Sequence, residues 1–140
     1  MPTTYKLPTD LKVLKCIYTM YADTFRDFKR EDPTRSSKIY IPIDVTKIAS
    51  SLGADPHVLF GRLYYHLDHK YSYKQDDGSV VHLFAFKIGD NLHCINYPYL
   101  AAVLSEHESE HRRSQWALRW SFAALVLSFV AIIVNALKIK

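Results

Sequence analysis

Apolar residues follow three different patterns along this chain of 140 residues. Between residues 11 and 28 they recur every three or four positions, which is typical of the buried face of an amphipathic helix. In residues 38–43 they alternate with polar ones and are β-branched, which favours a strand. Residues 120–137 are mostly apolar and contain no charge. Together the patterns predict a small α+β domain followed by an apolar helix.

The first predicted helix begins at Asp10, a residue type suited to the N-cap, and ends near Lys29. The polar stretch 29–37 then predicts a loop, because it mixes charges and contains a proline. The strand at 38–43 contains Pro42, which cannot donate a hydrogen bond to a neighbouring strand. We therefore expect a short strand at the edge of a sheet.

Two further helices have clear end signals. Residues 44–53 predict a short helix with an aspartate N-cap at its start and a glycine after its end. Asp55 and Pro56 begin the next helix, since proline is tolerated in the first turn, where its missing N–H has no intrahelical partner to lose. This helix continues to about Lys70.

Three strands are predicted after these helices. Residues 71–75 and 80–88 form the two strands of a hairpin, joined by a turn at 76–79. A second turn at 89–91 leads to a third strand, 92–96.

No proline or glycine interrupts residues 99–137, so we expect one continuous helix. After a domain of residues 1–97, residues 98–116 would form a juxtamembrane helix, 117–137 a transmembrane helix, and 138–140 a short tail. The charge-free run would be about 27 Å long as a helix, slightly short of the ~30 Å hydrocarbon core of a bilayer. A buried helix of a soluble protein is the alternative, but little chain remains to surround it.

The residues that flank the apolar run predict the orientation of the protein. Arg112, Arg113 and Arg119 precede the run, and the N-terminus lacks the apolar core of a signal peptide. We therefore expect a tail-anchored, single-pass membrane protein whose N-terminal domain is cytoplasmic. Lys138 and Lys140 weaken the charge bias, because both would have to cross the membrane.

The net charge of +4 belongs to the flanks of the apolar run. Residues 1–111 hold 13 Lys and Arg against 14 Asp and Glu, a net charge of −1. Nucleic-acid binders usually carry their basic excess on the binding domain, so this balance disfavours DNA as a partner. Cys16 and Cys94 lie among apolar residues, which predicts reduced thiols in the core.

No residue pattern points to catalysis or to a cofactor. His107 and His111 are four residues apart, and His66 and His69 are three apart, but neither pair has an evident third metal ligand. The chain also lacks a recognisable Ser/His/Asp, glycine-rich phosphate-loop or paired-carboxylate signature. We expect no metal, no cofactor and no enzymatic activity.

The predicted order of helix, strand, two helices and hairpin, with a tight turn between the two helices, resembles the winged helix-turn-helix fold over residues 10–97. Ala49 is small where two helices would approach, and Gly53 supplies the turn between them. The residues that carry the resemblance are Ile48, Ala49, Leu52, Gly53, Val58, Leu59, Leu63 and Leu67.

In this fold the third helix and the wing form the usual contact face, for DNA or for protein. The resemblance implies that this face consists of His57, Arg62, Tyr65, His69, Lys70 and Lys74. Only Arg62 suits bidentate recognition of guanine, and Asp68 lies on the same helix. An aromatic and histidine-rich face is better suited to a protein partner.

Small and polar residues form a stripe along the apolar helix, at alternating spacings of three and four: Ser121, Ala124, Ser128, Ala131 and Asn135. Such stripes let transmembrane helices approach closely, so the helix could pair with itself or with another membrane subunit. The alternative is that alanine and serine are simply common in such helices.

The sequence therefore predicts a tail-anchored membrane adaptor or accessory subunit whose winged-helix-like domain binds a protein partner. The alternative is a membrane-tethered, DNA-binding transcriptional regulator. A toxin or pore-forming protein fits less well, because the N-terminal domain is too regularly patterned.

Overall fold

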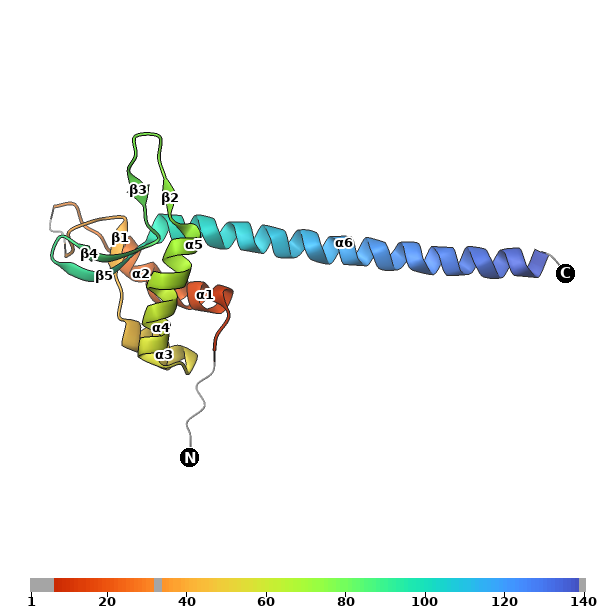
Figure 1. Cartoon of the computed structure of the whole chain (residues 1–140), viewed down its shortest axis with the longest axis horizontal. Helices are drawn as coiled ribbons and strands as arrows, with labels where there is room; N and C mark the ends of the chain where they lie inside the picture. Colours follow the sequence, from red (N-terminus) through yellow and green to blue (C-terminus); the bar gives the residue numbers. More distant parts are fainter. Residues whose placement is uncertain (1–6, 32–33, 139–140) are drawn as a thin grey trace, which may run out of the picture. The chain divides into compact units, whose positions relative to one another are not determined.

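The computed structural model describes residues 7–31 and 34–138 (Figure 1). The chain divides into two compact units, Met1–Leu104 and Ser105–Lys140. The first combines helices with small antiparallel sheets and the second is helical, so the predicted mixture of helix and sheet is confirmed.

The N-terminal helix differs from its prediction in its N-cap and in its C-terminal part. It consists of α1 (Asp10–Met20) and a separate short helix, α2 (Ala22–Arg26). Thr9 is the N-cap of α1, since its hydroxyl accepts a backbone N–H of the first turn at 3.4 Å. The prediction of Asp10 as the cap was wrong, because its carboxylate binds the guanidinium of Arg62 instead.

The next helix has the predicted bounds. In α3 (Val45–Leu52), the carboxylate of Asp44 accepts a backbone N–H at 2.9 Å. Gly53 ends the helix with a φ of 64°, in the left-handed region that glycine adopts without a steric cost.

The third helical run consists of α4 (Pro56–Gly61), η1 (Arg62–Asp68) and α5 (His69–Tyr71). Asp55 caps its start as predicted, by accepting two backbone N–H groups at 2.8 and 3.0 Å. The run ends one residue beyond Lys70, the expected end. Its middle part, η1, is a π-helix, which the apolar spacing does not predict.

Three strands form an antiparallel sheet in the order β1-β5-β4. They are β1 (Tyr40–Pro42), β4 (Phe84–Ile88) and β5 (Asn91–Asn96). The strand that contains Pro42 is at an edge of the sheet, as predicted.

The predicted hairpin of residues 71–75 and 80–88 forms only in part. Strands β2 (Tyr73–Lys74) and β3 (Val80–Val81) pair antiparallel in a separate two-stranded ribbon, which projects from the rest of the first unit (Figure 1). The segment 80–88 is divided between two sheets.

Asp68 explains the division. One oxygen of its carboxylate accepts the backbone N–H of Phe84 at 2.9 Å, and the other is 2.8 Å from Nδ1 of His82. The side chain of Leu83, between these two residues, is fully buried. Burial of Leu83 and the contacts of Asp68 therefore turn the chain out of the ribbon and into the sheet.

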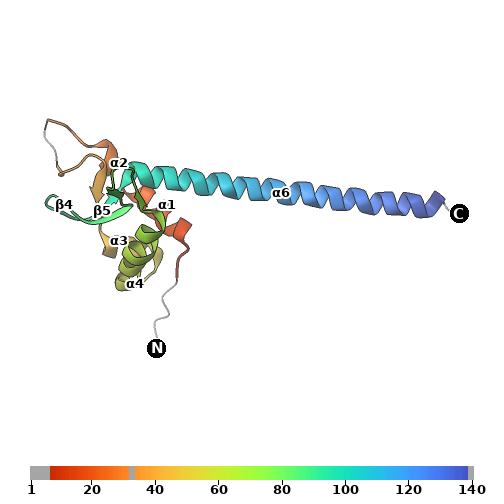
Figure 2. The same ribbon diagram turned by 45° about the horizontal axis from the view of Figure 1, so that its top comes forward.

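Helices α1, α3 and α4 are grouped beside the sheet in two views of the molecule (Figures 1 and 2). The fully buried side chains between them come from α1, β1, α3, the third helical run, β4, β5, the last helix and the segment before β4: Val13, Leu14, Ile17, Ile41, Ile48, Leu59, Leu63, Leu67, Leu83, Phe84, Ile95 and Leu100. One hydrophobic core therefore joins the helices to the sheet.

The last helix, α6 (Tyr97–Lys138), is continuous, as predicted. Its first turns belong to the first unit, where Leu100, Val103 and Leu104 are buried in the core. Among the described residues, only this helix is long and apolar enough to cross a membrane. Its most apolar 18-residue window has a mean hydropathy of 1.9, and none of that window is buried.

Candidate functional site

Aromatic rings from the third helical run and the sheet form a cluster on the first unit. The ring centroid of Phe60 of α4 lies 4.7 Å from the ring centroid of Tyr64 and 6.4 Å from that of Tyr65. Phe86 of β4 lies 6.2 Å from Tyr64 and 5.1 Å from His93 of β5. We call these five residues the aromatic face.

The π-helix brings the two tyrosines to the same neighbour. In an α-helix, residues four apart share a face, whereas the wider π turn aligns residues five apart. Because η1 begins directly after α4, both Tyr64 and Tyr65 contact Phe60. Single π turns occur often at functional sites.

His93 anchors the strand side of the aromatic face. Its φ of 53° makes it the one non-glycine residue with a positive φ among the described residues, a conformation that costs about 1–3 kcal/mol. Its carbonyl accepts the N–H of Ile43 at 2.7 Å, and its Nδ1 lies 3.0 Å from the hydroxyl of Tyr64. Burial, the main cause, raises the pKa of Tyr64 to about 12, and the charges of nearby groups act in the same direction. The hydroxyl therefore stays protonated at physiological pH.

Two members of the aromatic face are largely exposed. Tyr65 is 79% exposed and Phe86 is 56% exposed, whereas Phe60, Tyr64 and His93 are half-buried. Exposed aromatic side chains on a rigid base are typical of the centre of protein interfaces, where they bury a large area at a low entropic cost.

Arg62 and Lys70, two residues of the predicted contact face, are held by Asp10. Arg62 donates two hydrogen bonds to one carboxylate oxygen, at 2.7 and 3.0 Å. The other oxygen is 3.2 Å from Nε2 of His66 and 3.7 Å from Nζ of Lys70. We call these four residues the Asp10 cluster. The cluster directs Arg62 to α1. The contact of His66 with Asp10 was not predicted from the sequence.

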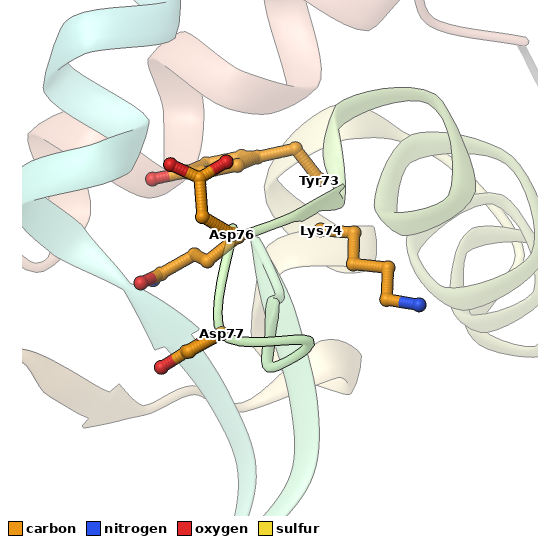
Figure 3. A pocket seen from close by; sticks show the side chains of 5 residues that line it. Tyr73, Lys74, Asp76 and Asp77 are labelled. Atoms are coloured by element: carbon orange, nitrogen blue, oxygen red, sulfur yellow. The ribbon is translucent and has the colours of Figure 1, made fainter.

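The remaining residues of the predicted face are not brought together in one site. His57 and His69 are exposed on α4 and α5, and Tyr65 belongs to the aromatic face. Lys74 is exposed on the β2–β3 ribbon, where it lines an open hollow of about 590 Å³. Figure 3 shows its side chain pointing away from those of Asp76 and Asp77, which line the same hollow.

Asp68, Ser72 and His82 form a trio of the residue types found in hydrolases. The hydroxyl of Ser72 lies 3.2 Å from Nδ1 of His82, and the carboxylate of Asp68 lies 2.8 Å from the same nitrogen. A catalytic triad uses the two ring nitrogens separately, one for the nucleophile and one for the carboxylate. The trio therefore supports the turn between ribbon and sheet and does not activate the serine.

The described residues of the chain contain no group of three or more His, Cys, Asp or Glu side chains that could hold a metal ion. Cys16 and Cys94 are both free thiols, and Cys94 is buried as predicted, whereas Cys16 is half-buried. Burial raises the pKa of the Cys94 thiol, which makes it a poor nucleophile.

In the second unit, apolar side chains are exposed on all sides of α6. Exposed residues of this segment include Trp116, Trp120, Phe122, Leu125, Phe129 and Ile132. The stripe residues Ser121, Ala124, Ser128 and Ala131 are exposed as well, and the side chain of Asn135 lies outside the described part. The hydroxyl of Ser128 donates to the carbonyl of Ala124 at 2.9 Å, within the same helix.

No protein-family model, curated protein or solved structure matches this chain. The class that fold and site define is a small α+β domain that carries one long apolar helix.

Of the aromatic face, only Tyr65 was predicted from the sequence. Helical spacing assigns aromatic residues such as Phe60 and Tyr64 to the core, and Phe86 was predicted only as part of a strand. The π turn and the backbone of His93 leave no simple mark in the sequence.

Proposed function

We propose that this protein is a membrane-anchored adaptor or accessory subunit that binds a protein partner through its aromatic face. Helix α6 is the anchor, and the first unit is the binding domain, on the cytoplasmic side. The observation that carries the proposal is the exposure of Tyr65 and Phe86 on a base of half-buried rings. An exposed aromatic cluster of this kind marks an interaction site better than isolated apolar residues do.

The winged-helix resemblance supports the binding role of the third helical run. The order of the elements, with β1 before α3 and the third helical run and with β4 and β5 after them, supports this resemblance. The β2–β3 ribbon is an addition between the third helix and the sheet. The aromatic face lies on the third helical run and the sheet, so it uses the elements that such domains commonly present to partners.

The alternative function, a membrane-tethered DNA-binding regulator, has less support. The guanidinium of Arg62, the residue best suited to read guanine, is bound to Asp10 through two hydrogen bonds. A DNA contact would have to break these bonds in a domain with a net charge of −1 over residues 1–111, where 13 Lys and Arg face 14 Asp and Glu.

A crosslinking experiment tests the protein-binding role. The full chain carries a photo-crosslinker at His69, which is exposed on the third helical run four residues after Tyr65. Complexes are isolated from nuclease-treated, detergent-solubilised membranes. We expect a discrete crosslinked protein partner that is lost in the Tyr65→Ser/Phe86→Ser double variant, because truncating central aromatic residues costs about 2 kcal/mol or more each at interfaces. A matched control, Tyr73→Ser, removes an aromatic residue that is 49% exposed on the ribbon and should keep the partner.

Equal crosslinking in the double variant and in the control would show that the aromatic face is not the binding site. Loss of the complex on nuclease treatment alone would favour the DNA-binding alternative.

A further inference from the structure

The Asp10 cluster gathers more positive than negative charge. Arg62, His66 and Lys70 are spaced four residues apart along the third helical run, and all three approach the carboxylate of Asp10 within 3.7 Å. Two permanent cations and a histidine therefore face a single carboxylate. Arg62 alone is sufficient to link α1 and η1, because it already donates two hydrogen bonds to Asp10.

The two outer side chains of the cluster are accessible. The side chain of His66 is 57% exposed and that of Lys70 is 45% exposed, whereas Arg62 is 27% exposed. A hydrogen bond with the side chain of Tyr71 is the main cause that raises the pKa of Lys70, and the charge of Asp10 adds to it. The ammonium therefore stays charged. An anion that approaches from solvent meets Lys70 and His66 first, with the guanidinium behind them.

We propose that the Asp10 cluster binds a phosphate group, which either a lipid headgroup or a free phosphate compound provides. A phosphate accepts several charge-assisted hydrogen bonds at once, and a guanidinium and an ammonium are the donors that proteins commonly use for it. The carboxylate of Asp10 orients the three donors and lowers the affinity through like-charge repulsion. The site is therefore weak, and its strength depends on Asp10.

The dependence on Asp10 separates a phosphate site from a purely structural ion pair. The full chain in an uncharged detergent is titrated with inorganic phosphate by calorimetry, with sodium chloride at equal ionic strength as the reference. We expect Asp10→Asn to bind phosphate about tenfold more tightly than the unchanged chain, because it removes the repulsion and keeps the shape of the side chain. Lys70→Gln should bind about tenfold more weakly.

Lys74→Gln is the matched control, since it removes an exposed lysine outside the cluster and should leave binding unchanged. The proposal is overturned if neither the unchanged chain nor Asp10→Asn binds phosphate, or if Lys70→Gln and Lys74→Gln behave alike. Circular dichroism of each variant shows whether it is folded. If Asp10→Asn does not fold, the comparison of Lys70→Gln with Lys74→Gln still decides the test.

A second arm identifies the source of the phosphate. The full chain is placed in phosphatidylcholine nanodiscs with or without phosphatidate, and its thermal unfolding is followed. Ligands that bind the folded state raise the midpoint by mass action. A rise with phosphatidate that Lys70→Gln abolishes indicates a lipid headgroup, whereas a rise with soluble phosphate alone indicates a free compound. No rise with either source contradicts the proposal, and none of these readouts depends on the protein partner.

Discussion

At the scale of single residues, tertiary contacts decide roles that local sequence leaves open. Asp10 has the residue type and position of an N-cap, but Arg62 from a distant helix takes its carboxylate. Arg35 stands in a polar segment, yet it is only 6% exposed, and its guanidinium donates to backbone carbonyls of Thr24 and Ser37 at 2.7 and 2.9 Å. The contact of Asp10 joins residues 52 apart, and that of Arg35 with Thr24 joins residues 11 apart, so the helical and loop patterns do not predict either role.

The Asp10 cluster makes stability depend on pH. Burial alone would raise the pKa of Asp10, but the hydrogen bonds and charges of Arg62 and His66 outweigh it and hold the pKa below the ordinary value of 3.8. The carboxylate of Asp10 therefore makes its full contribution to the free energy of unfolding above pH 3.8. This contribution is lost as the pH falls through the lower pKa of the folded state.

We expect Asp10→Asn to destabilise the domain by about 1–2 kcal/mol at pH 7, because it weakens hydrogen bonds to a charged group. The difference from the unchanged chain should shrink towards pH 3. Urea unfolding of the full chain in detergent at several pH values measures both effects, and a difference that is constant down to pH 3 would contradict this origin.

At the scale of secondary-structure elements, the sequence predicts those whose end signals are local. Helix α3 has its cap and its terminating glycine within ten residues, and both were found. The division of segment 80–88 was missed, because it depends on Asp68 in η1 and on the burial of Leu83. The same limit applies to the aromatic face, which a π turn and two strands assemble.

Substitution of two glycines by alanine should change the stability of the domain in opposite directions, which tests the assigned ends of the helices. Gly53 ends α3 with a φ of 64°, so Gly53→Ala should cost about 1 kcal/mol although nothing lies within 4 Å of the added Cβ. Gly61 lies inside the third helical run, where an added Cβ would meet only the ring of Tyr65 at 3.7 Å. Gly61→Ala should therefore stabilise by about 0.5–1 kcal/mol. Thermal unfolding of both variants measures this, and shifts in the same direction would contradict the assigned helix end.

The stripe on α6 allows a test of helix association. The hydroxyl of Ser128 is bonded within its own helix, so a contact there would depend on small size rather than on a hydrogen bond between helices. We expect Ser128→Leu with Ala131→Leu to abolish crosslinking between α6 and a partner helix while membrane insertion persists. Phe129→Leu, outside the stripe, is the control. Crosslinking that survives the double change would assign the stripe to ordinary lipid-facing composition.

At the scale of the whole molecule, the two units of the chain are suited to different solvents. The first unit buries its apolar side chains in one core that draws on all its major elements. The described side chains of α6 between Trp116 and Ile133 are apolar for the most part and have no such cover. An exposed apolar surface of this length is costly in water and favourable in a bilayer. This contrast supports the proposal that α6 holds the binding domain at a membrane.

Alkaline extraction of membranes from cells that express the full chain tests this claim most directly. We expect the unchanged chain to stay in the membrane pellet and to dissolve only in detergent. Leu125→Arg with Phe129→Arg should reduce insertion strongly, since each arginine at the centre of a spanning helix costs about 2.5–3.5 kcal/mol. Leu125→Ile with Phe129→Leu should behave like the unchanged chain. Recovery of the unchanged chain in the soluble fraction without detergent would contradict the account.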